Sequence, residues 1–294
     1  MKVSKTNKLK GVTKKLTTSG PKKGTRKRPI QANKSSGRKK NIKYSTKKKT
    51  KVSPWIIVGI VALFIIIFVI PYLIRESNPE FGDKVPEGSY QYCLDISHHN
   101  NSDIVWDSLA VVIDSGRRTR RDIEDGLEIK RLSSVIIKAT EGVSMKDKRF
   151  DEFWNKAGDS PIRRGAYHFF RTSTDPSKQA DNFIKTVGSL RHNDLPPVLD
   201  VEVMHKGCTR KELNDNVLIW LQIVENHYGR KPIVYTSDSY LRDILSEDIL
   251  EGYTIWVAHY GVKEPNYKDW EMWQFTDKAV VHGIKGKVDL SVMR

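Results

Sequence analysis

Two carboxylates stand two positions apart in the stretch DLPPVLDVEV, residues 194–203. Asp200 and Glu202 end an apolar run that predicts a strand, and side chains two apart on a strand share a face. Neighbouring acids repel when both are charged, so one ionises and the pKa of the other rises. A carboxylic acid with a raised pKa can protonate a leaving oxygen near neutral pH. The pair therefore indicates acid catalysis, although an isolated Asp-x-Glu at a strand end is more often a solvated edge.

Other polar and aromatic side chains follow apolar runs in the same way. The acids are Asp95, Glu141 and Asp289, and the accompanying groups are Tyr167, His168, Tyr235, Trp256, Trp273 and Gln274. Aromatic faces pack on the C–H surfaces of sugars, and two carboxyl groups flank the bond that a glycosidase breaks. A pocket of acids walled by aromatic rings is therefore typical of a carbohydrate hydrolase.

Eight short apolar runs are the elements that must position these groups. They are 92–97, 134–140, 164–170, 196–203, 232–237, 254–260, 271–275 and 287–292. Helical patterns separate most of them, and strand–helix alternation favours a parallel sheet covered on both faces. We expect an α/β fold, a modified TIM-like β/α barrel with about five regular units and a simpler closing part, because 260–287 leaves no room for full helices.

Capping signals locate two of the intervening helices. Asp175 precedes Pro176 at the start of one, and Thr209 with Glu212 forms a capping box for a second, which Gly229 ends. The charged stretch RRTRRDIEDGLEIKRL, residues 117–132, predicts an additional helical excursion.

Seven motifs occur in one order along the chain: LDISHHN, VIIKATEG, GAYHFFR, PPVLDVE, PIVYTS, IWVAHYG and WQFTDKAVVHGIKGKVDLSV. Residues 91–294 resemble the glycoside hydrolase family 25 lysozymes, the Chalaropsis-type N-acetylmuramidases. The resemblance implies a modified β/α barrel that cleaves the β-1,4 bond between N-acetylmuramic acid and N-acetylglucosamine in peptidoglycan. His98, His99 and His259 do not have the spacing of a helix-borne metal site, so we expect no metal, and we expect no cofactor. The family's motif acids correspond to Asp95, Asp200, Glu202 and Asp289.

Roles follow for each matched position. We expect Glu202 to be the general acid and Asp200 to stay ionised and assist the substrate acetamido group, which the resemblance implies can act as the nucleophile. The expected substrate-binding residues are Asp95, Tyr167, Tyr235, Trp256, Gln274 and Asp289. Trp256 is either a sugar platform or core. Glu141 either caps a turn or contacts sugar, and a satisfied buried histidine is the favoured role for His168.

An uncharged stretch of 20 residues, 55–74, precedes the barrel. About 20 apolar residues span a bilayer. The first 51 residues hold 20 Lys and Arg and no acid, whereas the remainder holds 31 basic and 35 acidic residues. We expect a disordered cytoplasmic tail (1–54), a transmembrane helix (55–74), a linker (75–89) and an extracytoplasmic barrel (90–294). The tail lacks interleaved aromatics, so anionic lipid is its expected contact rather than specific nucleic acid.

Three functions remain open from the sequence. The first is a membrane-anchored muramidase, the second a catalytically weak peptidoglycan-binding scaffold, and the third a glycosidase of another N-acetylhexosamine polymer such as chitin. The complete set of four acids argues against the scaffold. The spacing of Cys93 and Cys208 indicates neither a bridge nor a metal site, so we expect two free thiols.

Overall fold

The computed structural model describes residues 53–77, 80–100 and 103–294, so the basic tail up to Val52 lies outside the described residues. The first element is a continuous helix made of α1 (Pro54–Phe64), the π-helical stretch η1 (Ile65–Val69) and α2 (Ile70–Ser77). The π-helical residues end two positions before Pro71, whose missing N–H and ring disturb the regular ladder. Within the described residues one helix, Pro54–Leu73, is long and apolar enough to cross a bilayer; its mean hydropathy is 3.1 and none of it is buried.

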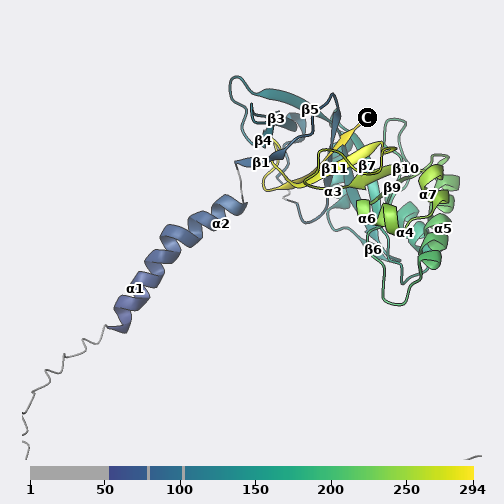
Figure 1. Ribbon diagram of the computed structural model, residues 1–294, viewed down its shortest axis with the longest axis horizontal. Helices are drawn as coiled ribbons and strands as arrows, with labels where there is room; N and C mark the ends of the chain where they lie inside the picture. Colours follow the sequence, from purple (N-terminus) through teal and green to yellow (C-terminus); the bar gives the residue numbers. More distant parts are fainter. Residues whose placement is uncertain (1–52, 78–79, 101–102) are drawn as a thin grey trace, which may run out of the picture. The chain divides into compact units, whose positions relative to one another are not determined.

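Eight strands close the barrel expected from the sequence (Figure 1). They are β2 (Gln91–Ile96), β5 (Glu128–Glu141), β7 (Arg163–Phe169), β8 (Val198–Asp200), β9 (Ile233–Ser237), β10 (Thr254–Ala258), β11 (Met272–Ala279) and β12 (Val288–Met293). Neighbours run in the order β5-β2-β12-β11-β10-β9-β8-β7, and pairing of β5 with β7 closes the ring. Only β12 is antiparallel to its two neighbours, β11 and β2. The modified TIM-like barrel is confirmed.

Alternation along each strand separates two apolar clusters. Cys93, Ile136, Val198 and Trp256 belong to the smaller cluster, which fills the barrel. The residues beside them in sequence, such as Leu94, Ile137, Leu199 and Val257, belong to the larger cluster between the strands and the helices. The period of two thus places alternate side chains on the inside and the outside of one closed sheet.

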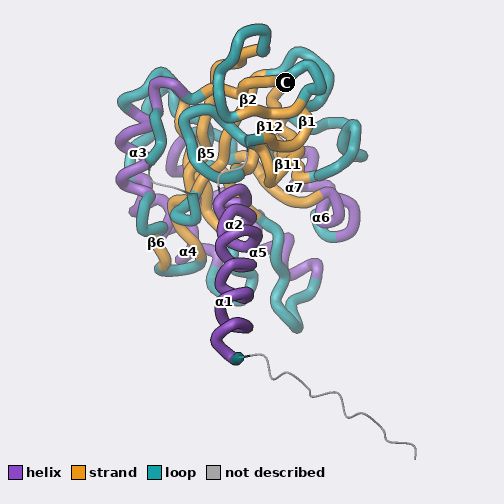
Figure 2. Tube along the Cα trace, turned by 90° about the vertical axis from the view of Figure 1, so that its left-hand side faces the viewer, coloured by secondary structure: helices purple, strands orange, loops and turns teal. Residues whose placement is uncertain are grey.

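Helices cover the outside of the strands (Figure 2). They are α3 (Phe150–Gly158), α4 (Pro176–Val187), α5 (Arg210–Tyr228), α6 (Asp238–Asp243) and α7 (Glu247–Gly252). The expected caps are confirmed, because Asp175 accepts from the N–H groups of Ser177 and Lys178, and Thr209 accepts from that of Glu212. Gly229 ends α5 at a φ of 63°, in the left-handed region that glycine adopts without strain.

The helical excursion expected over 117–132 is wrong. This stretch contains β4 (Arg118–Arg120) and the first residues of β5, and β3 (Ala110–Ile113) pairs antiparallel with both strands. The charges that suggested a helix are side chains of a β-ribbon, whereas Thr119 between two arginines is fully buried. Pairing of β4 and of the first residues of β5 with β3 outweighs the helical propensity of the segment.

The segment expected as a linker contains a strand. β1 (Phe81–Lys84) pairs antiparallel with β4, and the Thr276 hydroxyl of β11 donates to Asp83 at 2.6 Å. A side chain at Gly82 would meet the backbone N of Val280 at 2.5 Å and the carbonyl O of Lys278 at 2.7 Å. Residues 81–84 are therefore fixed against the barrel, and glycine is what permits this close approach.

Candidate active site

A polar layer lies at the C-terminal ends of the parallel barrel strands. Seven inward side chains make it up: Asp95, Lys138, Tyr167, Asp200, Tyr235, Gln274 and Asp289. The five of these side chains that lie on β2, β5, β8, β9 and β11 each stand two positions after an apolar inward residue, for example Asp200 after Val198. Residues two apart share a face of the strand, so the polar layer lies directly above a layer of apolar side chains inside the barrel.

A cavity of about 150 Å³ opens onto this layer. Its other lining residues are Ser97, His99, Phe169, Val198, Trp256 and Glu202. All eight site residues expected from the sequence therefore line this cavity. Four carboxyl groups converge here, from β2, from β12 and from the end of β8, which is the arrangement that the strand pattern predicted.

Asp200 and Glu202 differ in their environments. Asp200 is 6% exposed, and its buried Oδ1 atom has no hydrogen-bond partner among the described residues. Burial raises the pKa of Asp200 well above its usual value, and the nearby Glu202 raises it further. Glu202 lies at the rim and is more accessible to solvent than Asp200. Partial desolvation of its carboxyl group still raises its pKa. The sequence predicts that Asp200 stays ionised while Glu202 holds the proton. In the free protein, burial alone favours protonation of Asp200 instead.

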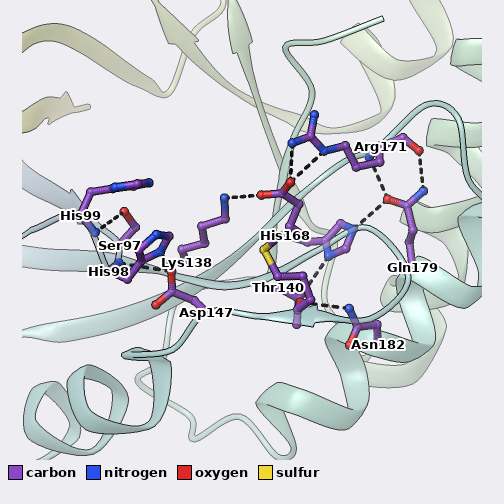
Figure 3. A network of polar contacts seen from close by, with 12 residues as sticks. Ser97, His98, His99, Lys138, Thr140, Asp147, His168, Arg171, Gln179 and Asn182 are labelled. Atoms are coloured by element: carbon purple, nitrogen blue, oxygen red, sulfur yellow. Dashed lines mark hydrogen bonds and ion pairs between the residues drawn. The ribbon is translucent and has the colours of Figure 1, made fainter. Parts of the chain in front are cut away.

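Lys138 is the positive group that opposes this protonation. Its side chain is buried within the cavity wall, its Nζ lies 4.7 Å from the centre of the Phe169 ring, and it lowers the pKa of both Asp200 and Glu202. Nζ donates to Glu141 at 2.7 Å, and Arg171 also donates to Glu141, through Nε at 2.8 Å and through Nη2 (Figure 3).

Glu141 therefore binds two cations, a role that the sequence did not predict. Burial opposes its ionisation, but hydrogen bonds from Lys138 and Arg171 lower the pKa of Glu141. The charged carboxylate holds both cations beside Asp200 and Glu202. Arg171 also lowers the pKa of Glu202, so a residue outside the cavity lining influences the protonation of an acid inside it.

Asp95 and Asp289 form a second acidic pair, linked to the aromatic wall by Gln274. The Nε2 amide group of Gln274 donates to both oxygens of Asp95 at 3.0 Å. Its Oε1 atom accepts from the hydroxyls of Tyr235 at 2.8 Å and Tyr260 at 2.5 Å. One buried amide thus fixes a carboxylate and two phenols, and Tyr260 is a participant that the sequence reasoning missed.

Trp256 lines the cavity floor but is only 2% exposed. Its indole N–H donates to Ser291 at 3.0 Å, and its ring lies edge-on to Tyr235 with centroids 4.6 Å apart. The structure therefore favours the core role over the sugar platform. Tyr167 and Tyr235 are more accessible, and burial raises the pKa of both phenols, so they are neutral hydrogen-bonding groups.

His168 is a satisfied buried histidine. Nδ1 lies 2.7 Å from the Thr140 hydroxyl and Nε2 lies 3.1 Å from Gln179 Oε1 (Figure 3). Burial lowers the pKa of His168 to about 4, so the ring is neutral. Gln179 Oε1 also accepts from the backbone N–H of Arg171 at 2.8 Å, so this network supports the strand end that carries Arg171.

Lys138 carried a signal that the sequence reasoning did not use. It is a lysine within the apolar run VIIKAT, two positions after the inward Ile136. A lysine on the buried face of a strand needs a partner, and Glu141 three positions later supplies it.

A larger hollow of about 480 Å³ lies between residues 83–87 and 261–263, on the outer side of β11 beside Trp273 and Phe275. It contains none of the four catalytic-type acids.

Comparisons with known proteins point to one family. Residues 94–284 match the glycosyl hydrolases family 25. The chain is 35% identical over 214 residues, 72% of each protein, to the uncharacterized protein YegX of Escherichia coli K12. It is 32% identical over 168 residues to the autolytic lysozyme of Clostridium acetobutylicum, covering 57% of this chain and 49% of that protein.

A solved structure shows the same fold. The bacterial lysozyme from Streptomyces coelicolor superposes with a TM-score of 0.59 at 27% identity, over 71% of this chain and 94% of that one. The match of family and fold confirms the resemblance drawn from the seven motifs. The chain therefore belongs to family 25 of the glycosyl hydrolases and is a glycoside hydrolase of the lysozyme type.

Proposed function

We propose that this enzyme hydrolyses the β-1,4 bond between N-acetylmuramic acid and N-acetylglucosamine in peptidoglycan, with Glu202 as general acid. The observation that carries the proposal is the buried Oδ1 atom of Asp200, which lacks a hydrogen-bond partner beside Glu202. An unpaired buried acceptor is costly unless a ligand supplies the donor. The N–H of a 2-acetamido group on the bound sugar is a donor of the right kind.

The chemical steps follow from this contact. Glu202 protonates the glycosidic oxygen as the C1–O bond breaks, and the acetamido oxygen bonds to C1 to give a cationic oxazolinium ring. Asp200 accepts the acetamido N–H and stabilises the positive charge. Glu202, now ionised, then takes a proton from the water that opens the ring. Lys138 supports the first step because its charge favours the ionised form of Asp200.

The test is product analysis with the full chain and purified peptidoglycan. New reducing ends on muramic acid are the expected result. Glu202→Gln preserves the shape of the side chain but delivers no proton, so the rate should fall by about 10²–10⁴-fold. Glu251→Gln, an exposed change on α7, is the matched control and should keep full activity. Reducing ends on N-acetylglucosamine, or a fully active Glu202→Gln variant, would overturn the proposal. Cleavage of chitin in preference to peptidoglycan would favour the third hypothesis.

We also propose that Pro54–Leu73 anchors the enzyme in the membrane, with the lysine-rich N-terminus in the cytoplasm and the barrel outside. The length and hydropathy of the helix, its exposed apolar side chains and the excess of Lys and Arg before Trp55 support this topology. Protease added to intact cells should digest the barrel and spare a tag at the N-terminus. Protection of the barrel would contradict the topology.

A further inference from the structure

A second hollow continues from the catalytic cavity. It measures about 390 Å³ and shares Glu202 and Tyr235 with the cavity that contains the acidic pairs. Its remaining lining residues are Ser237, Asp238, Ser239, Arg242, Ala258, His259 and Tyr260. A sugar held against Glu202 therefore has a polar compartment directly beside it, within reach of its substituents.

Arg242 is the fixed cation of this second hollow. It lies on α6, and its Nε donates to the buried carboxylate of Asp238 at 3.0 Å. Asn266 donates to the same Asp238 oxygen at 3.1 Å. Burial opposes the ionisation of Asp238, but hydrogen bonds from Asn266 and Arg242 lower its pKa. The charged carboxylate thus orients the guanidinium from one edge.

The rest of the guanidinium is accessible. The Arg242 side chain is 55% exposed, and the nearest further contact is from Nη1 to the exposed Asp243, at 3.9 Å. A guanidinium has five donors in a planar fork and binds carboxylates through two of them. The other strong cation along the two hollows, Lys138, is 9% exposed and already bound to Glu141. Of the lysine and arginine side chains that line the two hollows, Arg242 is therefore the one with donors available to a ligand.

We propose that Arg242, oriented by Asp238, binds a carboxylate carried by the 3-O-lactyl substituent of muramic acid. This inference rests on the proposed function and deepens it, because it makes the enzyme select glycans with an acidic substituent over plain N-acetylglucosamine polymers. The carboxylate has two possible sources with the same chemistry. One is the free lactyl group of peptide-stripped glycan, and the other is the stem peptide attached to it.

Binding of small fragments tests the inference without turnover. Calorimetry with the full chain would compare N-acetylmuramic acid, a muramyl dipeptide with a free carboxylate, and the carboxyl amide of each. Arg242→Gln should weaken binding of an acid fragment by about 3- to 10-fold, the range for a charge-assisted contact at a half-exposed site, and leave its amide unchanged. Arg242→Lys should restore part of the affinity. The fragment that responds identifies the source of the carboxylate.

Kinetics on polymeric glycan supply the second measurement. KM for peptidoglycan should rise in Arg242→Gln while kcat stays near the wild-type value, and the rise should vanish on peptidoglycan whose carboxylates have been converted to amides. Lys211→Gln is the matched control, because it removes the cation of another i,i+4 pair, Lys211–Asp215, that does not line either hollow.

Two results would overturn the inference: equal losses on acid and amide ligands, or no loss on any ligand. Failure of the proposed function is distinguishable from failure of this inference, because calorimetry would still detect fragment binding to a wild-type protein that does not cleave peptidoglycan.

Discussion

Asp95 and Asp289 stand directly opposite one another on the antiparallel strands β2 and β12. Burial raises the pKa of both carboxyl groups, that of Asp289 to about 6, and each acid acts on the other. Two carboxyl groups placed so closely share a proton, so the pair titrates as a unit. The amide of Gln274 donates to both oxygens of Asp95, which helps to hold this pair in the wall of the cavity.

Asp289→Asn should stabilise the fold at neutral pH. Because the folded-state pKa is raised from 3.8 to about 6, ionisation of Asp289 costs free energy of folding. That cost is absent below about pH 4, grows between pH 4 and 6 and is complete above pH 6. The variant should gain on the order of 1–3 kcal/mol at pH 7 and nothing at pH 4. Urea unfolding across this range measures the gain. A gain independent of pH, or one reproduced by the exposed Asp269→Asn, would contradict the argument.

Lys138→Met should move the whole pH profile of activity to higher pH. Lys138 lowers the pKa of Asp200 and Glu202, so its loss raises both. The limb that reports the ionised Asp200 and the limb that reports the protonated Glu202 both shift in the alkaline direction. Arg171→Gln should move only the limb of Glu202, since Arg171 lowers the pKa of that acid. An unchanged profile with uniformly lower rates would show that Lys138 acts only in packing.

Trp256→Ala should destabilise the barrel rather than only weaken substrate binding. Removing a buried tryptophan costs about 3–5 kcal/mol, and the ring also supports Tyr235. Thermal unfolding measures the loss. Ser291→Ala, which removes only the acceptor of the indole N–H, should cost a smaller amount, about 1–3 kcal/mol. Normal stability of Trp256→Ala with weakened binding of peptidoglycan fragments would restore the platform role.

Gly82→Ala should release β1 from the barrel. The added Cβ would meet two backbone atoms of 278–280 within 2.7 Å, and overpacking of this kind costs about 1–3 kcal/mol. Trypsin should then cleave at Lys84 faster than in the wild type. Gly252→Ala is the control, because nothing lies within 4 Å of a side chain there. Equal cleavage rates in wild type and Gly82→Ala would show that β1 is not held by this approach.

The sequence by itself determined the barrel strands and the acids of the site. Both follow from local rules: apolar runs of strand length mark β2, β5 and β7 to β12, and the period of two makes Asp200 share a face with Val198. The cap residues Asp175 and Thr209 likewise act within one helical turn, so their positions were readable. Family motifs extended this to an enzyme class, which the comparisons confirm.

Tertiary structure decided what depends on partners far apart in the chain. The stretch 117–132 has helical charges, but β3 pairs with both β4 and the first residues of β5, so the stretch forms strands. Asp200 rather than Glu202 is the buried acid, because the barrel wall closes around one side chain and leaves the other at the rim. The bond of Gln274 to Asp95 joins residues 179 positions apart. Burial and charge at a site sum over all neighbours in space, and sequence spacing reports only the neighbours along the chain.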